Sequence, residues 1–246
     1  MALLPMLSYA QKHKIKDQGK NSVMMTFNID DNIKTNSGDS FRYVLEIYDA
    51  TDQANLKFLR HLEQTTTEFD IQLVPGNAYT CLFWADKGIV NDNTSSSFNA
   101  ESLMNVQLND GKAMEEAFFR SVNFVMVETS DSKTLTLKRA VAKVELIEET
   151  QNTIGSTIEI KFNGYKGFNT LNGSVTGSQV SITENVITIA TTGLIGSFLT
   201  LAPVGTDSSG GVVVDLELTP NLGTTIWIQD TRLTANFKTK VHGTFK

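Results

Sequence analysis

The stretch TLTLKRAVAKVELIEE, residues Thr134–Glu149, decides the fold class of this chain. Apolar and polar residues alternate along it, with a change of phase at the Lys-Arg pair in its middle. A period of two is the signature of a β-strand that turns one face to a core and the other to water. We therefore expect a long strand in which Val144 and Leu146 are buried. On the opposite face, Lys143 and Glu145 are expected to be exposed.

Similar alternation recurs between clusters of turn-forming residues. Pro75-Gly76-Asn77 and Asn109-Asp110-Gly111 supply the backbone angles that reverse a chain. Many short strands separated by such turns are typical of antiparallel β-sandwiches. The other expected strands are Val23–Ile29, Arg42–Tyr48, Glu68–Val74, Ala78–Ala85, Val122–Val127, Ile158–Phe162, Val180–Ile189, Val212–Leu218 and Leu233–Phe245.

Helix-forming sequence is scarce. The best candidate is Gly111–Phe119 (GKAMEEAFF), and Ala100–Val106 could add a turn. The sequence therefore predicts an all-β protein, with two tandem antiparallel β-sandwich domains and a few short helices. A polar break follows Glu149, and the composition beyond it is poorer in charge. We place an N-terminal β-sandwich at residues 21–150 and a C-terminal β-sandwich at 151–246.

Residues 1–20 are interpreted as a leader remnant or a flexible N-terminus. Their first ten residues, MALLPMLSYA, form a short apolar stretch, and Ser8-Tyr9-Ala10 fits the small-x-small pattern of a signal-peptidase site. An ordinary frayed terminus fits equally well. No segment approaches the ~20 consecutive apolar residues that span a bilayer, so no transmembrane span is expected.

Composition limits the classes of function. The chain has 246 residues, of which 40% are hydrophobic and 20% are charged, which favours a packed core over disorder. A net charge of -6 and a pI of about 5.1 argue against binding to nucleic acid. The single cysteine, Cys81, excludes a disulfide within the chain and a cysteine zinc site. Its apolar surroundings predict a buried, inert thiol.

No catalytic constellation is apparent. His13, His61 and His242 stand apart, without HExxH spacing, and no GxSxG elbow is present. His61 has charged neighbours in the sequence and is expected at the surface. We predict that the protein is not an enzyme, that it needs no cofactor, and that it has no catalytic, cofactor-binding or metal site.

Two features of the sequence could indicate ligand binding, and each has a simpler interpretation. Asp86, Asn91, Asp92 and Asn93 crowd oxygen ligands into one loop that would suit calcium. The loop lacks EF-hand spacing, so a solvated loop is the preferred interpretation.

Aromatic residues could form a platform for stacking sugars. Tyr79, Phe83 and Trp84 are candidates, but Phe83 and Trp84 are adjacent on a strand and so point to opposite faces. At least one of them belongs to the core. Trp227 is the better candidate for exposure, although a core position is the default for tryptophan.

Five segments in order carry a resemblance to a known family: FRYVLEIYDA (Phe41–Ala50), YTCLFWADKG (Tyr79–Gly88), AMEEAFF (Ala113–Phe119), LTLKRAVAKVEL (Leu135–Leu146) and TANFKTKVHGTF (Thr234–Phe245). Over most of residues 22–245 the chain resembles the fimbrillin-like proteins of Bacteroidetes, which include pilin, tip and anchor subunits of type V pili. The resemblance implies two transthyretin-like sandwiches, export as a lipoprotein and a place in a fimbrium at the outer membrane and cell surface. No cysteine follows the leader, so a lipid anchor would require a true N-terminus upstream of Met1.

The resemblance also implies a function. We expect a non-enzymatic structural or adhesive subunit that assembles by β-strand exchange with other fimbrial subunits, or binds host or bacterial surface ligands. In polymerising members a protease removes an N-terminal strand. Here Lys20, Lys34 and Arg42 are the basic residues that precede the second expected strand. The alternative is a surface glycan-binding β-sandwich module, which would require exposed aromatic residues in a groove.

Overall fold

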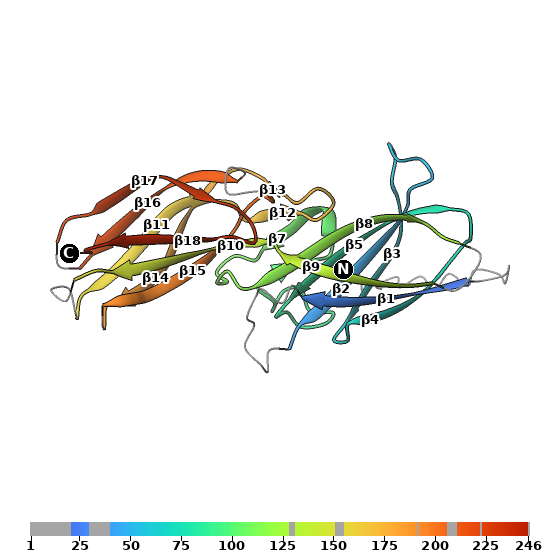
Figure 1. Cartoon of the computed structure of the whole chain (residues 1–246), viewed down its shortest axis with the longest axis horizontal. Coiled ribbons are helices and arrows are strands. Elements are labelled where there is room, and N and C mark those ends of the chain that lie inside the picture. The colour runs from blue at the N-terminus through green and yellow to red at the C-terminus, as the bar shows by residue number, and fades with distance from the viewer. Residues whose placement is uncertain are drawn as a thin grey trace, which may run out of the picture.

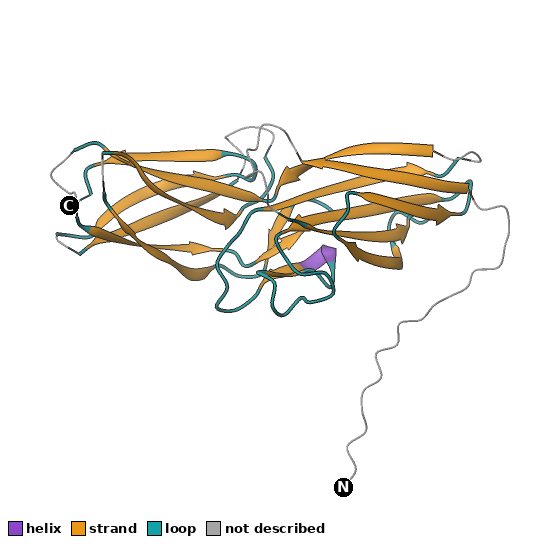
Figure 2. Ribbon diagram, turned by 90° about the horizontal axis from the view of Figure 1, so that it is seen from below, coloured by secondary structure: helices purple, strands orange, loops and turns teal. Residues whose placement is uncertain are grey.

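The computed structural model describes residues 21–29, 40–127, 131–150, 155–190, 192–205, 211–221 and 223–245. The molecule is an elongated assembly of β-sheets, with strands β1–β5, β8 and β9 toward one end and β10, β11 and β14–β18 toward the other (Figure 1). Within the described ranges there is no α-helix. A single 3-10 turn, η1 (Leu103–Asn105), lies among the loops gathered near the middle of the long axis (Figure 2).

The strands follow one another with short connections. In the first part of the chain they are β1 (Asn21–Ile29), β2 (Arg42–Asp49), β3 (Lys57–Gln64), β4 (Glu68–Leu73), β5 (Ala78–Asp86), β6 (Phe98–Asn99), β7 (Val106–Leu108), β8 (Ala117–Val125) and β9 (Asp131–Arg139). In the second part they are β10 (Val141–Glu148), β11 (Thr157–Gly164), β12 (Gly167–Asn169), β13 (Ser174–Thr176), β14 (Val180–Thr188), β15 (Gly193–Leu201), β16 (Val212–Pro220), β17 (Ile226–Leu233) and β18 (Lys238–Gly243).

The N-terminal part is one seven-stranded sheet folded on itself, in the order β3-β2-β5-β8-β9-β1-β4. Strands β8 and β9 pair only at Phe118↔Arg139 and Phe119↔Lys138, so the sheet can bend there. The two wings then pack face to face over one apolar core, in the manner of a sandwich. This N-terminal core contains Val23, Met25, Phe41, Leu45, Ile47, Phe69, Ile71, Leu73, Tyr79, Cys81, Phe83, Ala85, Phe118, Met126 and Leu137.

The C-terminal part consists of two sheets. A three-stranded sheet, β15-β10-β18, faces a four-stranded sheet, β14-β11-β16-β17, across a second core. The alternation of Ile158, Ile160 and Phe162 along β11 points these side chains into that core, as the sequence predicts. The members of this C-terminal core are Ala142, Val144, Leu146, Ile158, Ile160, Phe162, Ile189, Phe198, Ala202, Val214, Leu216, Leu218, Leu233, Ala235, Val241 and Phe245.

A small fourth sheet, β13-β12-β7-β6, takes two strands from each part of the chain. Phe168 of β12 lies opposite Val106 of β7 and packs its ring 4.8 Å from that of Phe119 and 6.0 Å from that of Trp84, between centroids. The two parts therefore share a third core. This central core contains Val44, Tyr48, Leu82, Trp84, Phe98, Ala100, Leu103, Val106, Ala117, Phe119, Ala140, Val141, Phe168 and Leu201.

The expected strand at Thr134–Glu149 is two strands. Strand β9 ends at Arg139 and β10 begins at Val141, so the break at Ala140 lies next to the predicted change of phase. Ala140 is fully buried in the central core, where the chain passes from one sheet to another. Strand partners therefore change at Ala140, upstream of the domain boundary that the sequence suggested.

The predicted burial along β10 is right for one face and wrong for the other. Val144 and Leu146 are 0% exposed, as expected. Glu145, however, is buried and Lys143 is half-buried, because β10 has a neighbour on each edge. The carboxylate of Glu145 lies 3.4 Å from Nζ of Lys143 and 3.3 Å from Nζ of Lys238, which supplies the charge that its burial requires.

The helix predicted at Gly111–Phe119 is absent. Residues 112–116 have no regular structure, and Ala117–Phe119 open strand β8. Pairing of Phe118 and Phe119 with β5 places one ring in the N-terminal core and the other in the central core, which overrides local helix propensity. The turn expected within Ala100–Val106 is present as η1.

The sheets are also not purely antiparallel. Strand β1 runs parallel to β9, and β10 runs parallel to β18. Parallel neighbours need long connections, and alternation within a strand does not reveal which distant strand lies beside it. The expected leader at residues 1–20 lies outside the described residues.

Replacing Val144 by Asp tests the C-terminal core. Val144 is 0% exposed, so the substitution buries an unpaired charge and should lower the free energy of unfolding by about 4 kcal/mol or more. Val125→Asp is the matched control, because Val125 is 59% exposed and should tolerate the change at a cost below about 1 kcal/mol. Chemical denaturation followed by circular dichroism measures both. Equal stability of the two variants would show that the register of β10 is wrong.

Truncation of Phe168 tests the central core. Phe168→Ala should cost about 3–5 kcal/mol, because the side chain is 0% exposed and holds β12 against β5 and β8. Phe58→Ala removes a ring that is 53% exposed and should cost about 1 kcal/mol or less. Guanidinium titrations give both values, and a loss at Phe168 no larger than that at Phe58 would contradict a shared core.

Candidate functional site

The N-terminal strand β1 occupies an interior position in its sheet. It runs parallel to β9 on one edge and antiparallel to β4 on the other. The register places Val23 opposite Ile71 and Met25 opposite Phe69. A strand that comes first in the chain but lies between two later strands can be removed only by opening both ladders. Its departure would leave a slot with two unpaired edges.

Strand β1 also fills part of the N-terminal core. Val23 and Met25 are 0% exposed, whereas Met24 between them is 40% exposed. Every second side chain therefore enters the core, which is the pattern by which a strand is recognised when it adds to a sheet. Burying each such side chain is worth roughly 1.5–3 kcal/mol. An empty slot would expose the apolar residues beneath it, including Phe69 and Ile71.

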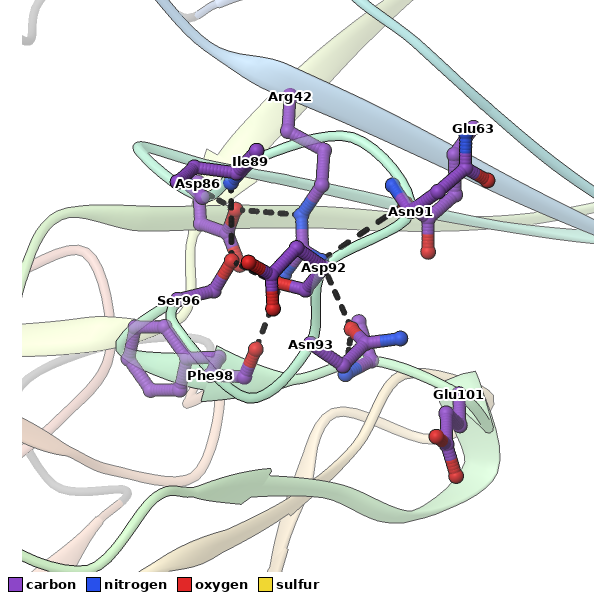
Figure 3. A network of polar contacts seen from close by, with 12 residues as sticks. Arg42, Glu63, Asp86, Ile89, Asn91, Asp92, Asn93, Ser96, Phe98 and Glu101 are labelled. Atoms are coloured by element: carbon purple, nitrogen blue, oxygen red, sulfur yellow. Dashed lines mark hydrogen bonds and ion pairs between the residues drawn. The ribbon is translucent and has the colours of Figure 1, made fainter.

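A network of buried polar contacts holds the start of β2 in place. Arg42, the first residue of β2, has a side chain that is 0% exposed and forms a two-pronged ion pair with Asp86 at the end of β5. Its Nε donates to Oδ1 of Asp86 at 3.0 Å, and its Nη2 donates to Oδ2 at 2.8 Å. The same guanidinium donates to Oδ1 of Asn93 at 2.7 Å and to the carbonyl of Phe98 at 3.0 Å (Figure 3).

Asp86 accepts further hydrogen bonds beyond those from Arg42. The indole N–H of Trp84 donates to Oδ2 at 2.7 Å, and the backbone N–H of Gly88 donates to Oδ1 at 2.8 Å. Breaking a buried pair of this kind by removing one partner typically costs about 3–5 kcal/mol. The start of β2 is therefore held in place independently of the segment that precedes it.

Arg42 also contacts the loop that carries Asn91, Asp92 and Asn93, which the sequence marks as rich in side-chain oxygens. Oδ1 of Asn93 accepts a hydrogen bond from the Arg42 guanidinium (Figure 3) and another from the backbone N–H of Ala100. Asp92 accepts the backbone N–H of Ser95 at 2.9 Å. The interpretation as a solvated loop is wrong for Asp86, which is 1% exposed. Among the described residues, no group of three or more histidine, cysteine or acidic side chains is arranged to hold a metal ion.

His61 lies between two carboxylates and its side chain is 26% exposed, so it is half-buried at the surface rather than freely solvated. Its Nδ1 is 3.2 Å from Oε1 of Glu46, and its Nε2 is 3.2 Å from Oε1 of Glu63. Burial alone lowers the pKa of His61, but the hydrogen bonds and charges of Glu46 and Glu63 outweigh it and raise the pKa from 6.5 to about 9. The second oxygen of Glu46 accepts the Tyr48 hydroxyl and the backbone N–H of Leu103.

The other residues singled out in the sequence are either buried in a core or exposed at the surface. Cys81 is fully buried, as predicted, and burial raises the pKa of its thiol to about 12. Phe83 and Trp84 enter different cores, as their alternation requires, and Tyr79 is buried too, so these three form no sugar platform. Trp227 is 60% exposed. Lys20, Lys34 and His13 lie outside the described residues.

The predicted cleavage sites need one correction. Arg42 was among the basic residues at which an N-terminal strand could be cut, but its side chain is enclosed by Asp86, Asn93 and Phe98. A protease cannot seat that side chain while the fold is intact. Sequence reasoning missed the structural role of Arg42, because its partner Asp86 is distant in the chain and no spacing rule connects the two.

Solved structures from Bacteroidetes have similar folds. A candidate adhesin from Bacteroides thetaiotaomicron VPI-5482 matches with a TM-score of 0.58 at 12% identity, over 85% of this chain and 79% of that chain. A candidate polysaccharide-binding protein (DUF1812) from the same strain gives a TM-score of 0.56 at 14% identity, over 92% and 90%. The tip fimbrial protein Mfa3 from Porphyromonas gingivalis, truncated at its C-terminus, gives 0.53 at 11% identity, over 85% and 81%.

At the level of fold these matches confirm the resemblance to fimbrillin-like proteins, because the chain has the architecture of candidate adhesins and fimbrial proteins from Bacteroidetes. The chain belongs to DUF6562, a family of unknown function, whose sequence model matches residues 14–245. No curated protein matches the chain. The described residues contain no helix that is long and apolar enough to cross a membrane.

Protonated His61 should stabilise the fold in a pH-dependent way. Because the folded pKa is raised above the unfolded value, its contribution is complete between about pH 5 and 6.5 and is lost as the pH rises through about 9. His61→Ala should therefore destabilise by about 1–3 kcal/mol near pH 6, and by much less at pH 10.

Urea denaturation of both proteins across this pH range measures the difference. His242→Ala is the control, because His242 and its partner Glu149 have side chains that are 53% and 56% exposed. A difference between wild type and His61→Ala that does not change with pH would refute the role of the His61 charge.

Proposed function

We propose that this protein is a non-enzymatic structural or adhesive subunit of a bacterial cell-surface fimbria, and that it assembles with other subunits by exchange of β1. The observation that carries the proposal is the interior position of β1 between β9 and β4, with Val23 and Met25 seated in the N-terminal core. The folds of fimbrial and adhesin proteins support the same class of function.

Strand exchange requires that β1 leave while the rest of the fold stays. The Arg42–Asp86 network meets this requirement, because it fixes the first residue of β2 without help from β1. The slot left by β1 would present unpaired N–H and C=O groups and an apolar floor. A strand from a neighbouring subunit, with apolar side chains at every second position, would pair with these N–H and C=O groups and cover the apolar floor. The resulting complex should dissociate slowly.

The position of the cut follows from the same geometry. Cleavage at Lys20 would leave β1 attached to the rest of the chain, because Lys20 precedes Asn21, where β1 starts. Cleavage at Arg42 is blocked by its burial. Of the three basic residues, Lys34 alone lies in the sequence between the end of β1 and the start of β2. We therefore assign the proposed proteolytic cleavage to Lys34.

A donor strand is available at the other end of the chain. Among the described strands, β18 pairs only with β10 and forms the edge of its three-stranded sheet. In this proposal β18 leaves its own C-terminal core, in which Val241 is buried, and reaches into the slot of the next subunit, where Val241 makes an apolar contact. We further propose two tandem transthyretin-like domains divided at Ala140, and export to the outer membrane and cell surface.

Limited digestion with a trypsin-like protease tests the proposal. Wild-type protein cleaved at Lys34 should form polymers visible by electron microscopy, whereas Lys34→Gln should stay intact at that position and monomeric. Lys57→Gln, which removes an exposed basic residue outside β1, is the control and should behave like wild type. Mass spectrometry identifies the cut. A chain that is cleaved at Lys34 and remains monomeric, even with other fimbrial subunits present, would defeat strand exchange.

A further inference from the structure

The outer face of the four-stranded sheet β14-β11-β16-β17 is hollowed. The hollow has a volume of about 400 Å³, within the roughly 300–1,000 Å³ of ligand-binding pockets. We term it the Trp227 hollow. Its lining residues are Lys161, Phe162, Asn163, Gln179, Ser181, Val213, Val214, Asp215, Glu217, Trp227 and Asp230.

Strand register explains how these side chains meet. Trp227 on the edge strand β17 lies opposite Glu217 of β16, and Glu217 lies opposite Lys161 of β11. Opposite residues point to the same face, so an exposed indole and two charged side chains form a row across three strands. Asn163 of β11 and Ser181 of β14 form a second pair on this face. The row is directed away from the C-terminal core.

A β-bulge shapes one side of the Trp227 hollow. The pairing of β16 with β17 shifts between Val214 and Leu216, and Asp230 adopts a φ of 55°, which is uncommon for residues other than glycine. The backbone N–H of Asp230 donates to Oδ1 of Asp215 at 3.0 Å. This bond fixes one carboxylate and leaves its second oxygen for another donor. Bulges of this kind often orient side chains beside functional sites.

We infer that the Trp227 hollow binds a neutral saccharide. An indole that is 60% exposed offers a flat apolar surface to the C–H face of a sugar ring. Carboxylates accept hydrogen bonds from sugar hydroxyls, while Asn163, Gln179 and Ser181 can both donate and accept, which suits the paired hydroxyls of a pyranose. The inference deepens the proposed adhesive role by naming a ligand class, and it does not depend on strand exchange.

Charge narrows the class of ligand. Asp215, Glu217 and Asp230 contribute three carboxylates to the lining against one ammonium, that of Lys161. Lys161 is itself paired with Glu159, which together with Glu217 raises the pKa of Lys161. Sialylated or sulfated glycans would be repelled. A basic peptide could use the carboxylates but would leave the amide and hydroxyl groups without a matched role, so a neutral glycan fits the full lining better.

A printed array of defined neutral, sialylated and sulfated oligosaccharides tests the inference on the full chain. Wild type should bind at least one neutral oligosaccharide and none of the acidic ones. Titration calorimetry with that oligosaccharide should show that Trp227→Ala weakens binding about tenfold or more, with a smaller loss for Trp227→Phe. Asp215→Asn should also weaken binding.

Phe58→Ala is the matched control, because Phe58 is 53% exposed on β3, outside the Trp227 hollow, and its loss should leave affinity unchanged. Thermal unfolding of Trp227→Ala should match wild type, which separates binding from folding. Absence of any neutral ligand, binding unaffected by Trp227→Ala, or binding of oligolysine alone would overturn the inference. Polymer formation by Trp227→Ala after cleavage tests the fimbrial proposal separately, so failure of one leaves the other standing.

Discussion

The packing of Phe168 against Trp84 and Phe119 is the contact on which the arrangement of the whole molecule depends. Phe168 comes from the C-terminal part of the chain, whereas Trp84 and Phe119 belong to the seven-stranded sheet. All three rings are at most 7% exposed. Because the fourth sheet draws strands from both parts, the sandwiches are joined through a shared apolar core rather than by a bare linker.

Each buried acid near this junction has a partner that offsets the cost of removing it from water. Asp86 is met by Arg42 and Trp84, Glu46 by His61 and Tyr48. An unpaired charge in these positions would be expensive, so the partners specify how strands and loops must assemble. The buried Arg42–Asp86 pair holds the start of β2 in place, so β1 can leave the fold without releasing β2.

The two proposed activities use different surfaces of the molecule. Strand β1 lies in the seven-stranded sheet, while Trp227 lies on the outer face of the C-terminal sheet formed by β14, β11, β16 and β17 (Figure 1). Exchange of β1 would alter the N-terminal core and leave the Trp227 hollow unchanged. A subunit with this arrangement can be held in a polymer through β1 and β18 and still present the outer face of the four-stranded sheet β14-β11-β16-β17.

The sequence by itself determined the all-β class, the positions of β1, β2, β4, β5, β11, β14 and β16, the buried faces of β4 and β11 and the burial of Val144, Leu146 and Cys81, because period-two alternation is a local property. It did not indicate β3 or β15, and the single strand expected at Leu233–Phe245 is the end of β17 followed by the separate strand β18. Tertiary structure alone decided that Phe118 lies in a strand rather than a helix, that β1 is parallel to β9, that Glu145 is buried, and that His61 lies between two carboxylates. These outcomes depend on which distant strands become neighbours. The pairing of Arg42 with Asp86, and the meeting of Trp227 with Glu217 and Lys161, belong to the same category, because only the folded register brings those side chains together.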